Sequence, residues 1–324
     1  MSLADANQAQ AAVNLLRRSF NADTTLRYSA NVQIAAMYGE HKMQTRAHLM
    51  RAPRRLTVTY LSGDRRGLEG GFNERWFWRR EDKDAPIQAY AEVAYRPEEM
   101  AAQRFALMTR NYRGRILRRE NIGDSVCDVV EIRRTQPLQN ARGPFKRLWL
   151  DRQSGLTLRS DAYNYRGDLV QRSVLSNLQL APAVQSFVQP AQMKAVALKT
   201  SWKNEELGAN RAKVVAMTNL APPQPTWLPA GFTFDSVGMQ RTSLSKDAPV
   251  AALSRYGDGM NVITIFSFKT PAKKAESKTA ERVSCTFGAG AMAMRETPGG
   301  LTLLAIGDLP TETLNRVLDS VPAT

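Results

Sequence analysis

Histidine and cysteine are scarce in this sequence, and their scarcity excludes several classes of active site. The 324 residues include two cysteines, Cys127 and Cys285, and two histidines, His41 and His48. These four residues lack the spacing of a zinc site, and a histidine-dependent triad would have only two candidates. We therefore expect no enzyme, no metal site and no cofactor. The cysteines are interpreted as partly buried thiols, with a disulfide between them as the alternative.

Long apolar runs are also missing. No stretch reaches about 18 consecutive apolar residues, so the protein is expected to be peripheral to a membrane at most. Residues 1–24 lack the basic start and apolar run of a signal peptide. An Ala/Gln-rich helical pattern follows Met1 almost at once, which is typical of an extracytoplasmic chain whose leader has been removed.

Acidic residues are few relative to basic ones. The chain has 45 Lys and Arg against 30 Asp and Glu, a net charge of +15. Residues 1–200 hold 32 basic against 19 acidic residues, a balance of +13, and nearly all of this positive charge is arginine. Because arginine grips carboxylates and phosphates through paired hydrogen bonds, acidic partners are favoured. The candidates are anionic lipid headgroups, an acidic protein segment or nucleic acid.

The apolar periodicity predicts helices and many short strands. Spacings of three and four predict an amphipathic helix over 6–20, and Pro97 begins a second helix that runs to about Arg110. Alternating apolar and polar residues predict strands over 26–34, 43–49, 54–61, 75–80, 115–120, 126–133, 145–151, 155–163 and 169–180. Turns are predicted at several glycines, including Gly70-Gly71. The first part of the chain is therefore predicted to be a curved antiparallel sheet with two helices.

Proline marks a division of the chain. Residues 191–225 end in Ala221-Pro222-Pro223-Gln224-Pro225 and have the composition of a linker. The domains are predicted to span 1–190 and 226–324. In the second domain, strands are predicted over 251–256, 261–269, 281–287, 291–296 and 301–307, followed by a helix over 310–321. This domain is a small α+β module.

Two stretches resemble a known family. Arg147-Leu-Trp-Leu-Asp-Arg-Gln-Ser-Gly-Leu-Thr-Leu-Arg-Ser160 is similar to a hairpin of RseB/MucB proteins and, more loosely, of the lipoprotein carriers LolA and LolB. The continuation, Tyr163 to Gln171, fits the next strand of that motif. Trp227-Leu-Pro-Ala-Gly-Phe232 and Ser254-Arg-Tyr-Gly-Asp-Gly259 are similar to signatures of the RseB/MucB C-terminal domain. The middle strands and the segment before Trp227 depart from the family.

The resemblance implies a LolA/LolB-like half-barrel at 1–190 that holds acyl chains, and a C-terminal domain that helps to grip an anti-sigma factor. It also implies a periplasmic protein that restrains envelope stress signalling until an amphiphile displaces it. The expected partners are the extracytoplasmic domain of an anti-sigma factor and an acylated lipid or lipoprotein, with self-association possible. Alternatives are a lipoprotein carrier of the LolA type and an arginine-rich nucleic-acid binder.

A set of apolar residues is predicted to line the cavity, on one sheet face and on the covering helix: Tyr28, Val32, Ile34, Leu49, Val58, Trp76, Trp78, Phe105 and Met108. Ordinary core packing is the alternative for each of them. The run Arg75–Arg80 could stack and hold RNA, but packing with solvated arginines is favoured. The GxGxxA pattern at Gly288–Ala293 lacks a βαβ setting, so a turn is favoured over a nucleotide site.

Overall fold

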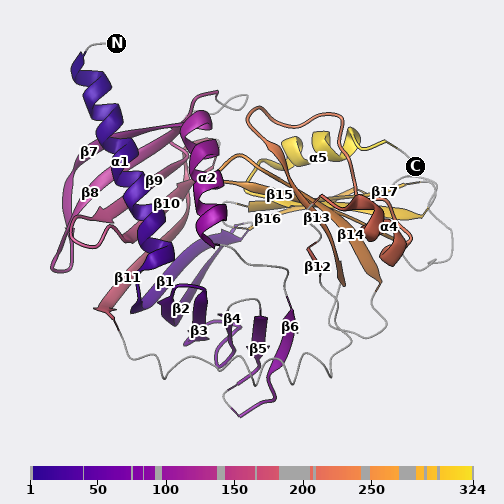
Figure 1. Cartoon of the computed structure of the whole chain (residues 1–324), viewed down its shortest axis with the longest axis horizontal. Coiled ribbons are helices and arrows are strands. Elements are labelled where there is room, and N and C mark those ends of the chain that lie inside the picture. The colour runs from indigo at the N-terminus through magenta and orange to yellow at the C-terminus, as the bar shows by residue number, and fades with distance from the viewer. Residues whose placement is uncertain are drawn as a thin grey trace. The chain divides into compact units, whose positions relative to one another are not determined.

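The computed structural model of the chain contains two compact units. The N-terminal unit comprises Met1–Ala89 with Ala94–Thr200, and the C-terminal unit comprises Tyr90–Val93 with Ser201–Thr324 (Figure 1). The structure describes residues 3–38, 40–73, 76–82, 84–91, 97–136, 143–164, 166–181, 205–206, 209–241, 249–269, 282–287, 290–297 and 300–322. Among these residues, no helix combines the length and apolar character needed to cross a membrane.

The N-terminal unit is a long antiparallel sheet with two helices. Its elements are α1 (Leu3–Thr25), β1 (Tyr28–Tyr38), β2 (His41–Ala52), β3 (Arg55–Tyr60), β4 (Glu69–Asn73), β5 (Trp76–Arg80), α2 (Pro97–Asn111), β7 (Tyr112–Ile122), β8 (Ser125–Arg134), β9 (Lys146–Asp151), β10 (Thr157–Tyr163) and β11 (Leu169–Leu180). The strand β6 (Gln88–Ala91) contributes residues to both units.

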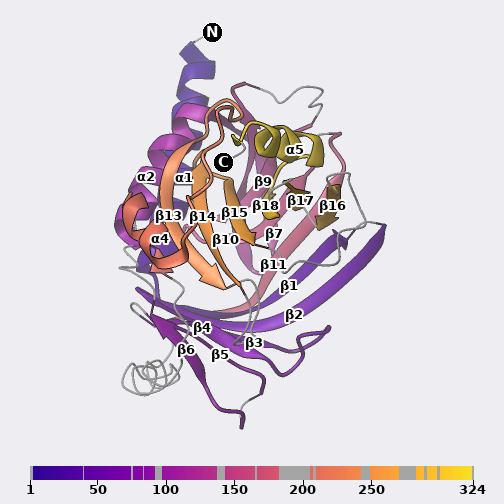
Figure 2. The same cartoon turned by 90° about the vertical axis from the view of Figure 1, so that its right-hand side faces the viewer.

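The strands of this sheet pair in the order β7-β8-β9-β10-β11-β1-β2-β3-β4-β5, with every pair antiparallel. Figure 2 shows β1 and β2 as long curved strands. An open, curved antiparallel sheet with helices confirms the predicted α+β class and half-barrel architecture.

The two helices cover one face of the sheet. In Figure 1 they lie in front of β7–β10, and the Phe20 ring of α1 meets the Phe105 ring of α2 edge to face at 5.6 Å. A Cβ built on Gly114 of β7 would lie 3.0 Å from the Leu16 side chain and 3.3 Å from that of Ala12. Glycine therefore lets α1 approach β7 closely, and both Leu16 and Ala12 are buried.

One turn prediction was wrong. Gly70 and Gly71 lie inside the strand β4, not in a turn. A Cβ on Gly71 would lie 1.8 Å from the main-chain oxygen of Leu56 in β3. The residue is glycine because the neighbouring backbone occupies the place of a side chain, which is a common reason for glycine within a strand.

The C-terminal unit is a second antiparallel sheet with helices on one face. Its elements are β12 (Glu205–Glu206), α4 (Arg211–Thr218), β13 (Thr233–Arg241), β14 (Val250–Gly257), β15 (Val262–Lys269), β16 (Arg282–Phe287), β17 (Gly290–Glu296), β18 (Leu301–Gly307) and α5 (Thr311–Asp319). The strands pair in the order β12-β13-β14-β15-β18-β17-β16. The helix α4 falls within residues 191–225, where proline had suggested only a linker.

The motif at Trp227, which precedes β13, holds the last helix of this unit. The Trp227 amide donates to the Ser320 hydroxyl at 3.1 Å, and the Thr226 amide donates to the Ser320 carbonyl at 3.0 Å. The Arg316 guanidinium of α5 lies 4.0 Å from the centre of the Trp227 ring. The tryptophan of the motif therefore has a structural role, since it fixes the last helix to the segment that precedes β13.

Candidate ligand-binding face

The strand register shows which side chains share the helix-covered face of the N-terminal sheet. Residues directly opposite each other in antiparallel strands point to the same side. One such row runs through Ile116, Val130, Leu148, Ser160, Ser173 and Ile34. Val130 lies next to the point where α1 approaches β7, so the row belongs to the face under the helices. We call it the helical face.

Five of the predicted cavity residues lie on the helical face. Ala30 and Leu49 are opposite each other, as are Leu49 and Val58, so β1, β2 and β3 present one continuous apolar surface. Val32, Ile34, Leu49 and Val58 are each half-buried. These side chains are therefore neither sealed in a core nor fully exposed.

Tyr28 begins this surface and is buried. Its hydroxyl donates to the Asp23 carboxylate at 3.3 Å, and Arg51 forms an ion pair with the same carboxylate at 3.3 Å. Burial, followed by the charge of Asp23, raises the pKa of the Tyr28 phenol well above its usual range. The ring packs in a cluster with Ala22 of α1 and with Ala30. Tyr28 is therefore a structural anchor at the start of β1.

The register places Trp78 on the other face of the sheet. Trp78 is opposite Gly71, and Gly71 is opposite Thr57, whereas Val58 points the other way. Trp78 is buried but does not share the surface of Ile34 and Val58. Trp76 has the same strand parity, and its side chain lies outside the described residues.

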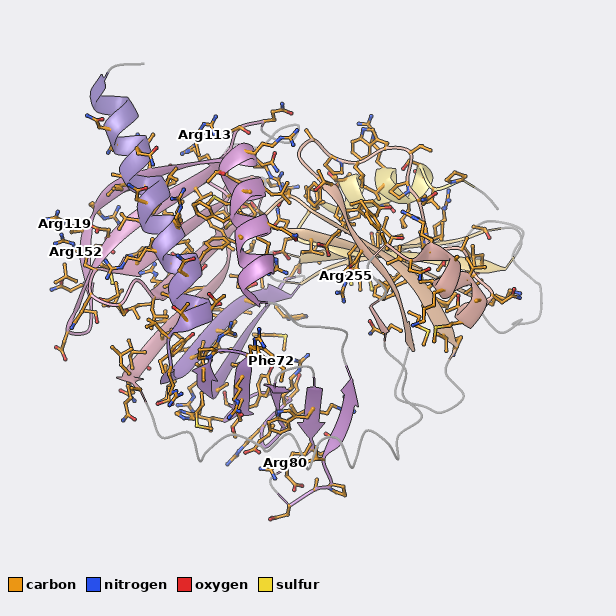
Figure 3. The ribbon with its side chains drawn as sticks, viewed as in Figure 1. Phe72, Arg80, Arg113, Arg119, Arg152 and Arg255 are labelled. Carbon is orange, nitrogen blue, oxygen red and sulfur yellow. The ribbon has the colours of Figure 1, made fainter. Side chains whose placement is uncertain are left out.

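Phe72 is an aromatic residue of the helical face that the sequence analysis missed. It is opposite Leu56, which is opposite Arg51, and the Arg51 guanidinium lies 5.6 Å from the centre of the Phe72 ring. Figure 3 labels Phe72. The flanking glycines concealed the strand, although Gly71-Phe72-Asn73 alternates as a strand does.

The two predicted helix residues differ in their surroundings. Met108 is buried, while Phe105 is half-buried between Phe20 and the guanidinium of Arg17, which lies 5.2 Å from its ring centre. Phe105 therefore joins α2 to α1.

A groove of about 610 Å³ lies between α1 and β7. It is lined by Leu15 and Arg119 among others, but by none of the predicted cavity residues.

The opposite face of the sheet, which we call the open face, carries a row of alternating charges. Arg115 of β7, Glu131 of β8, Arg147 of β9, Asp161 of β10 and Arg172 of β11 are successive cross-strand neighbours. Neighbouring strands are about 4.8 Å apart, so this row is roughly 19 Å long. Opposite charges placed directly across a strand pair stabilise the sheet.

Each acid of this charge row is held by two arginines. Asp161 accepts hydrogen bonds from Arg159 at 2.7 and 3.1 Å and from Arg172 at 2.8 Å through both of its oxygens. Glu131 accepts from Arg133 at 2.8 Å and from Arg147 at 3.0 Å. Burial by itself raises the pKa of each acid, but these arginines outweigh burial and hold both pKa values below their usual range.

A similar arrangement occurs in the first half of β8, on the helical face, where Asp128 forms ion pairs with Arg119 at 3.4 Å and with Arg152 at 3.5 Å. Figure 3 shows these two arginines close together. The carboxylates are enclosed and the arginines are exposed, so solvent meets mainly guanidinium groups in this part of the protein.

The sequence motif around Trp149 builds this region. Leu148 and Leu150 are buried, with Leu148 in the row of the helical face, while Trp149 points to the open face and packs under the Arg159 guanidinium at 4.0 Å. The indole also donates to Glu120; this bond, together with Arg118, lowers the pKa of the Glu120 carboxyl. Asp151 then accepts from the Ser154 amide and hydroxyl at 2.7 and 2.6 Å and closes the turn.

Both cysteines are free thiols in the structure, Cys127 buried and Cys285 half-buried. Burial, followed by the charge of Asp151, raises the pKa of Cys127 to about 11. Within the described residues, no three His, Cys, Asp or Glu side chains are grouped as metal ligands.

Comparison with known proteins agrees with this architecture. The model of the MucB/RseB N-terminal domain matches residues 11–198. The sigma factor AlgU regulatory protein MucB of Pseudomonas aeruginosa is 29% identical over 176 residues, which are 54% of this chain and 50% of that protein. The match therefore spans about half the length of this curated relative.

Solved structures show the same fold over nearly the whole chain. The complex of Pseudomonas aeruginosa MucA and MucB aligns with a TM-score of 0.62 at 20% identity, covering 96% of this chain and 98% of that chain. MucB alone aligns with a TM-score of 0.56 at 17% identity over the same shares. The family model covers more than half of the sequence, and the resemblance seen in the hairpin at 147–160 is confirmed. The chain belongs to the MucB/RseB family.

Proposed function

We propose that this protein is a periplasmic regulator that binds the extracytoplasmic part of an anti-sigma factor and whose helical face takes up acyl chains. The observation that carries the proposal is the apolar surface of Val32, Ile34, Leu49 and Val58, which is half-buried on the helix-covered side of a curved sheet. Family membership and the fold shared with MucB bound to MucA support the protein partner.

The physical basis of acyl binding is burial of hydrocarbon. Each methylene group transferred from water to an apolar surface contributes about 0.8 kcal/mol, so a chain of about sixteen carbons supplies roughly 13 kcal/mol. After an association cost of about 4–5 kcal/mol, this is enough for micromolar binding. A sheet face that the helices cover only in part offers such an apolar surface, so the protein does not have to open its core before an acyl chain binds. Binding of an amphiphile beside the partner would then relieve the restraint on the anti-sigma factor.

The acyl site is tested by native mass spectrometry of the purified protein, organic extraction of anything bound, and titration with a fluorescent fatty acid. Val58→Glu places a charge in the proposed lining and is expected to weaken binding at least tenfold, because an unpaired charge in an apolar site is costly. Val126→Glu is the matched control, since Val126 is 44% exposed. Equal affinity of both variants and the wild type would exclude this face as the acyl site.

The partner is tested separately by calorimetry with the periplasmic segment of the anti-sigma factor from the same organism. Saturable binding at micromolar or lower concentration, weakened by a saturating fatty acid, is the expected result. Binding that is unaffected by the fatty acid would retain the partner but refute the coupling. Absence of binding would refute the regulatory role.

A further inference from the structure

The open face of the N-terminal sheet displays more cationic groups than its own acids neutralise. We define the arginine face as Arg113, Arg115, Arg118, Arg133, Arg147, Arg159 and Arg172. The acids that share this face are Glu120, Glu131, Asp151 and Asp161, so it keeps a net charge of +3, from seven arginines less four carboxylates. A face on which arginines served only to neutralise carboxylates would need equal numbers of the two, so three of these arginines exceed that need.

The excess of positive charge is larger at the solvent-exposed surface, because the acids are more deeply buried than the arginines. The side chains of Glu131 and Asp161 are 5% and 2% exposed, whereas those of Arg133 and Arg172 are 55% and 40% exposed. Arg115 is also exposed and forms no ion pair among the described contacts. The carboxylates therefore act from beneath the arginines and fix their position, while the guanidinium groups form the outer layer.

Fixed guanidinium groups are well suited to phosphate. An arginine already held in place loses less conformational freedom when it binds, and its planar fork matches the oxygens of a phosphate. Arg159 and Arg172 each use Nε and one terminal nitrogen on Asp161, which leaves the other terminal nitrogen of each for an external acceptor. The array extends across five strands, from Arg115 to Arg172.

We propose that the arginine face docks on an anionic phospholipid bilayer. The arginines are spread in two dimensions over β7–β11, which fits a surface of many phosphates better than a single extended peptide. Charge complementarity identifies the occupant, because the anionic headgroups of a bilayer attract basic residues near its surface. This docking is independent of the acyl site and of the anti-sigma partner.

The test is co-sedimentation of the full chain with vesicles of phosphatidylcholine, with or without phosphatidylglycerol. The variant Arg115→Gln/Arg133→Gln/Arg172→Gln removes three charges from the face and leaves Glu131 and Asp161 with one arginine each. We expect it to bind phosphatidylglycerol vesicles at least tenfold more weakly, because each basic residue near an anionic surface contributes about fivefold. The wild type should ignore pure phosphatidylcholine and dissociate at about 0.5 M salt.

The matched control is Arg27→Gln/Arg65→Gln/Arg66→Gln, which removes three exposed arginines elsewhere in the N-terminal unit. A change of less than about threefold supports docking through the arginine face. Equal weakening of both triple variants, or binding that does not require phosphatidylglycerol, would overturn it. Polyglutamate that binds the wild type as tightly as the vesicles do would make an acidic protein segment the occupant instead.

The single variant Arg115→Glu keeps the test informative if the triple variant does not fold. Arg115 is exposed at the end of the charge row and holds no buried acid in the described contacts. Its reversal sets a glutamate opposite Glu131, a like-charge pair that weakens the sheet locally but removes no arginine that holds a buried carboxylate. Binding to phosphatidylglycerol vesicles should fall about tenfold or more, since two units of charge are lost. Unchanged binding would overturn the proposal.

Discussion

Removing the carboxylate of Asp161 should destabilise the N-terminal unit strongly. In the Asp161→Ala variant, Arg159 and Arg172 face each other without the acid that joins them. Breaking a buried ion pair from one side costs about 3–5 kcal/mol. Because the arginines are 23% and 40% exposed, solvent screens part of the remaining repulsion. We therefore expect a loss of about 2–3 kcal/mol in the free energy of unfolding.

The assay is thermal and urea unfolding, followed by tryptophan fluorescence, since Trp149 lies beneath Arg159. For a unit of this size, the loss corresponds to a decrease of roughly 6–10 °C in Tm. Glu81→Ala is the control, because Glu81 is 64% exposed and lies 3.6 Å from Arg79. An exposed pair of this kind contributes about 0–1 kcal/mol.

A double variant separates pairing from simple loss of contacts. In Asp161→Ala/Arg172→Gln the remaining repulsion is reduced, so the double variant should be more stable than the sum of the single effects predicts. The reasoning is refuted if Asp161→Ala costs no more than Glu81→Ala, or if the two substitutions are strictly additive.

Three further predictions follow from the described contacts. Glu131 and Asp161 have folded-state pKa values below those of the unfolded chain, so their stabilisation is complete above about pH 4.5 and is lost as the pH falls through the folded values. Urea unfolding between pH 7 and 3 should show this decrease, and Asp161→Asn should reduce it. Gly71→Ala should cost at least about 2 kcal/mol, measured by urea unfolding, because the added Cβ meets the β3 backbone. At pH 8, a thiol reagent should modify Cys285 quickly and Cys127 only after denaturation.

For each of these three predictions, one result would contradict the reasoning. Stability that stays constant down to pH 3 would mean that the two acids are not held ionised by the fold. Gly123 has no heavy atom within 4 Å of a built Cβ, so Gly123→Asn is the control for Gly71→Ala, and equal losses would contradict the steric argument. Equal rates of modification for both thiols would show that Cys127 is accessible.

Alternation of apolar residues was sufficient to predict most strands, because it depends only on local spacing. The shared surface of Val32, Leu49 and Val58 follows from that alternation together with short turns. The opposite orientation of Trp78 does not, since it depends on how β4 joins β3 to β5. Once Gly70-Gly71 was interpreted as a turn, that strand and its register were lost.

The charge row could not be predicted for a related reason. Its members are far apart in the sequence, and only the pairing of β7 through β11 brings them into line. The sequence showed an excess of arginine but not which arginines hold acids. Likewise α4 was concealed because its neighbourhood is rich in proline, although Asn210 caps its first turn by accepting from the Lys213 amide at 3.0 Å.

The hydrogen bonds between Thr226 and Ser320 join the segment before β13 to the residue that follows α5. They close a chain segment that contains β13 to β18, so opening this contact releases both of its ends at once. Amide hydrogen exchange at Thr226 and in the last turn of α5 should therefore occur at one common rate, and separate rates would show that the two ends open independently.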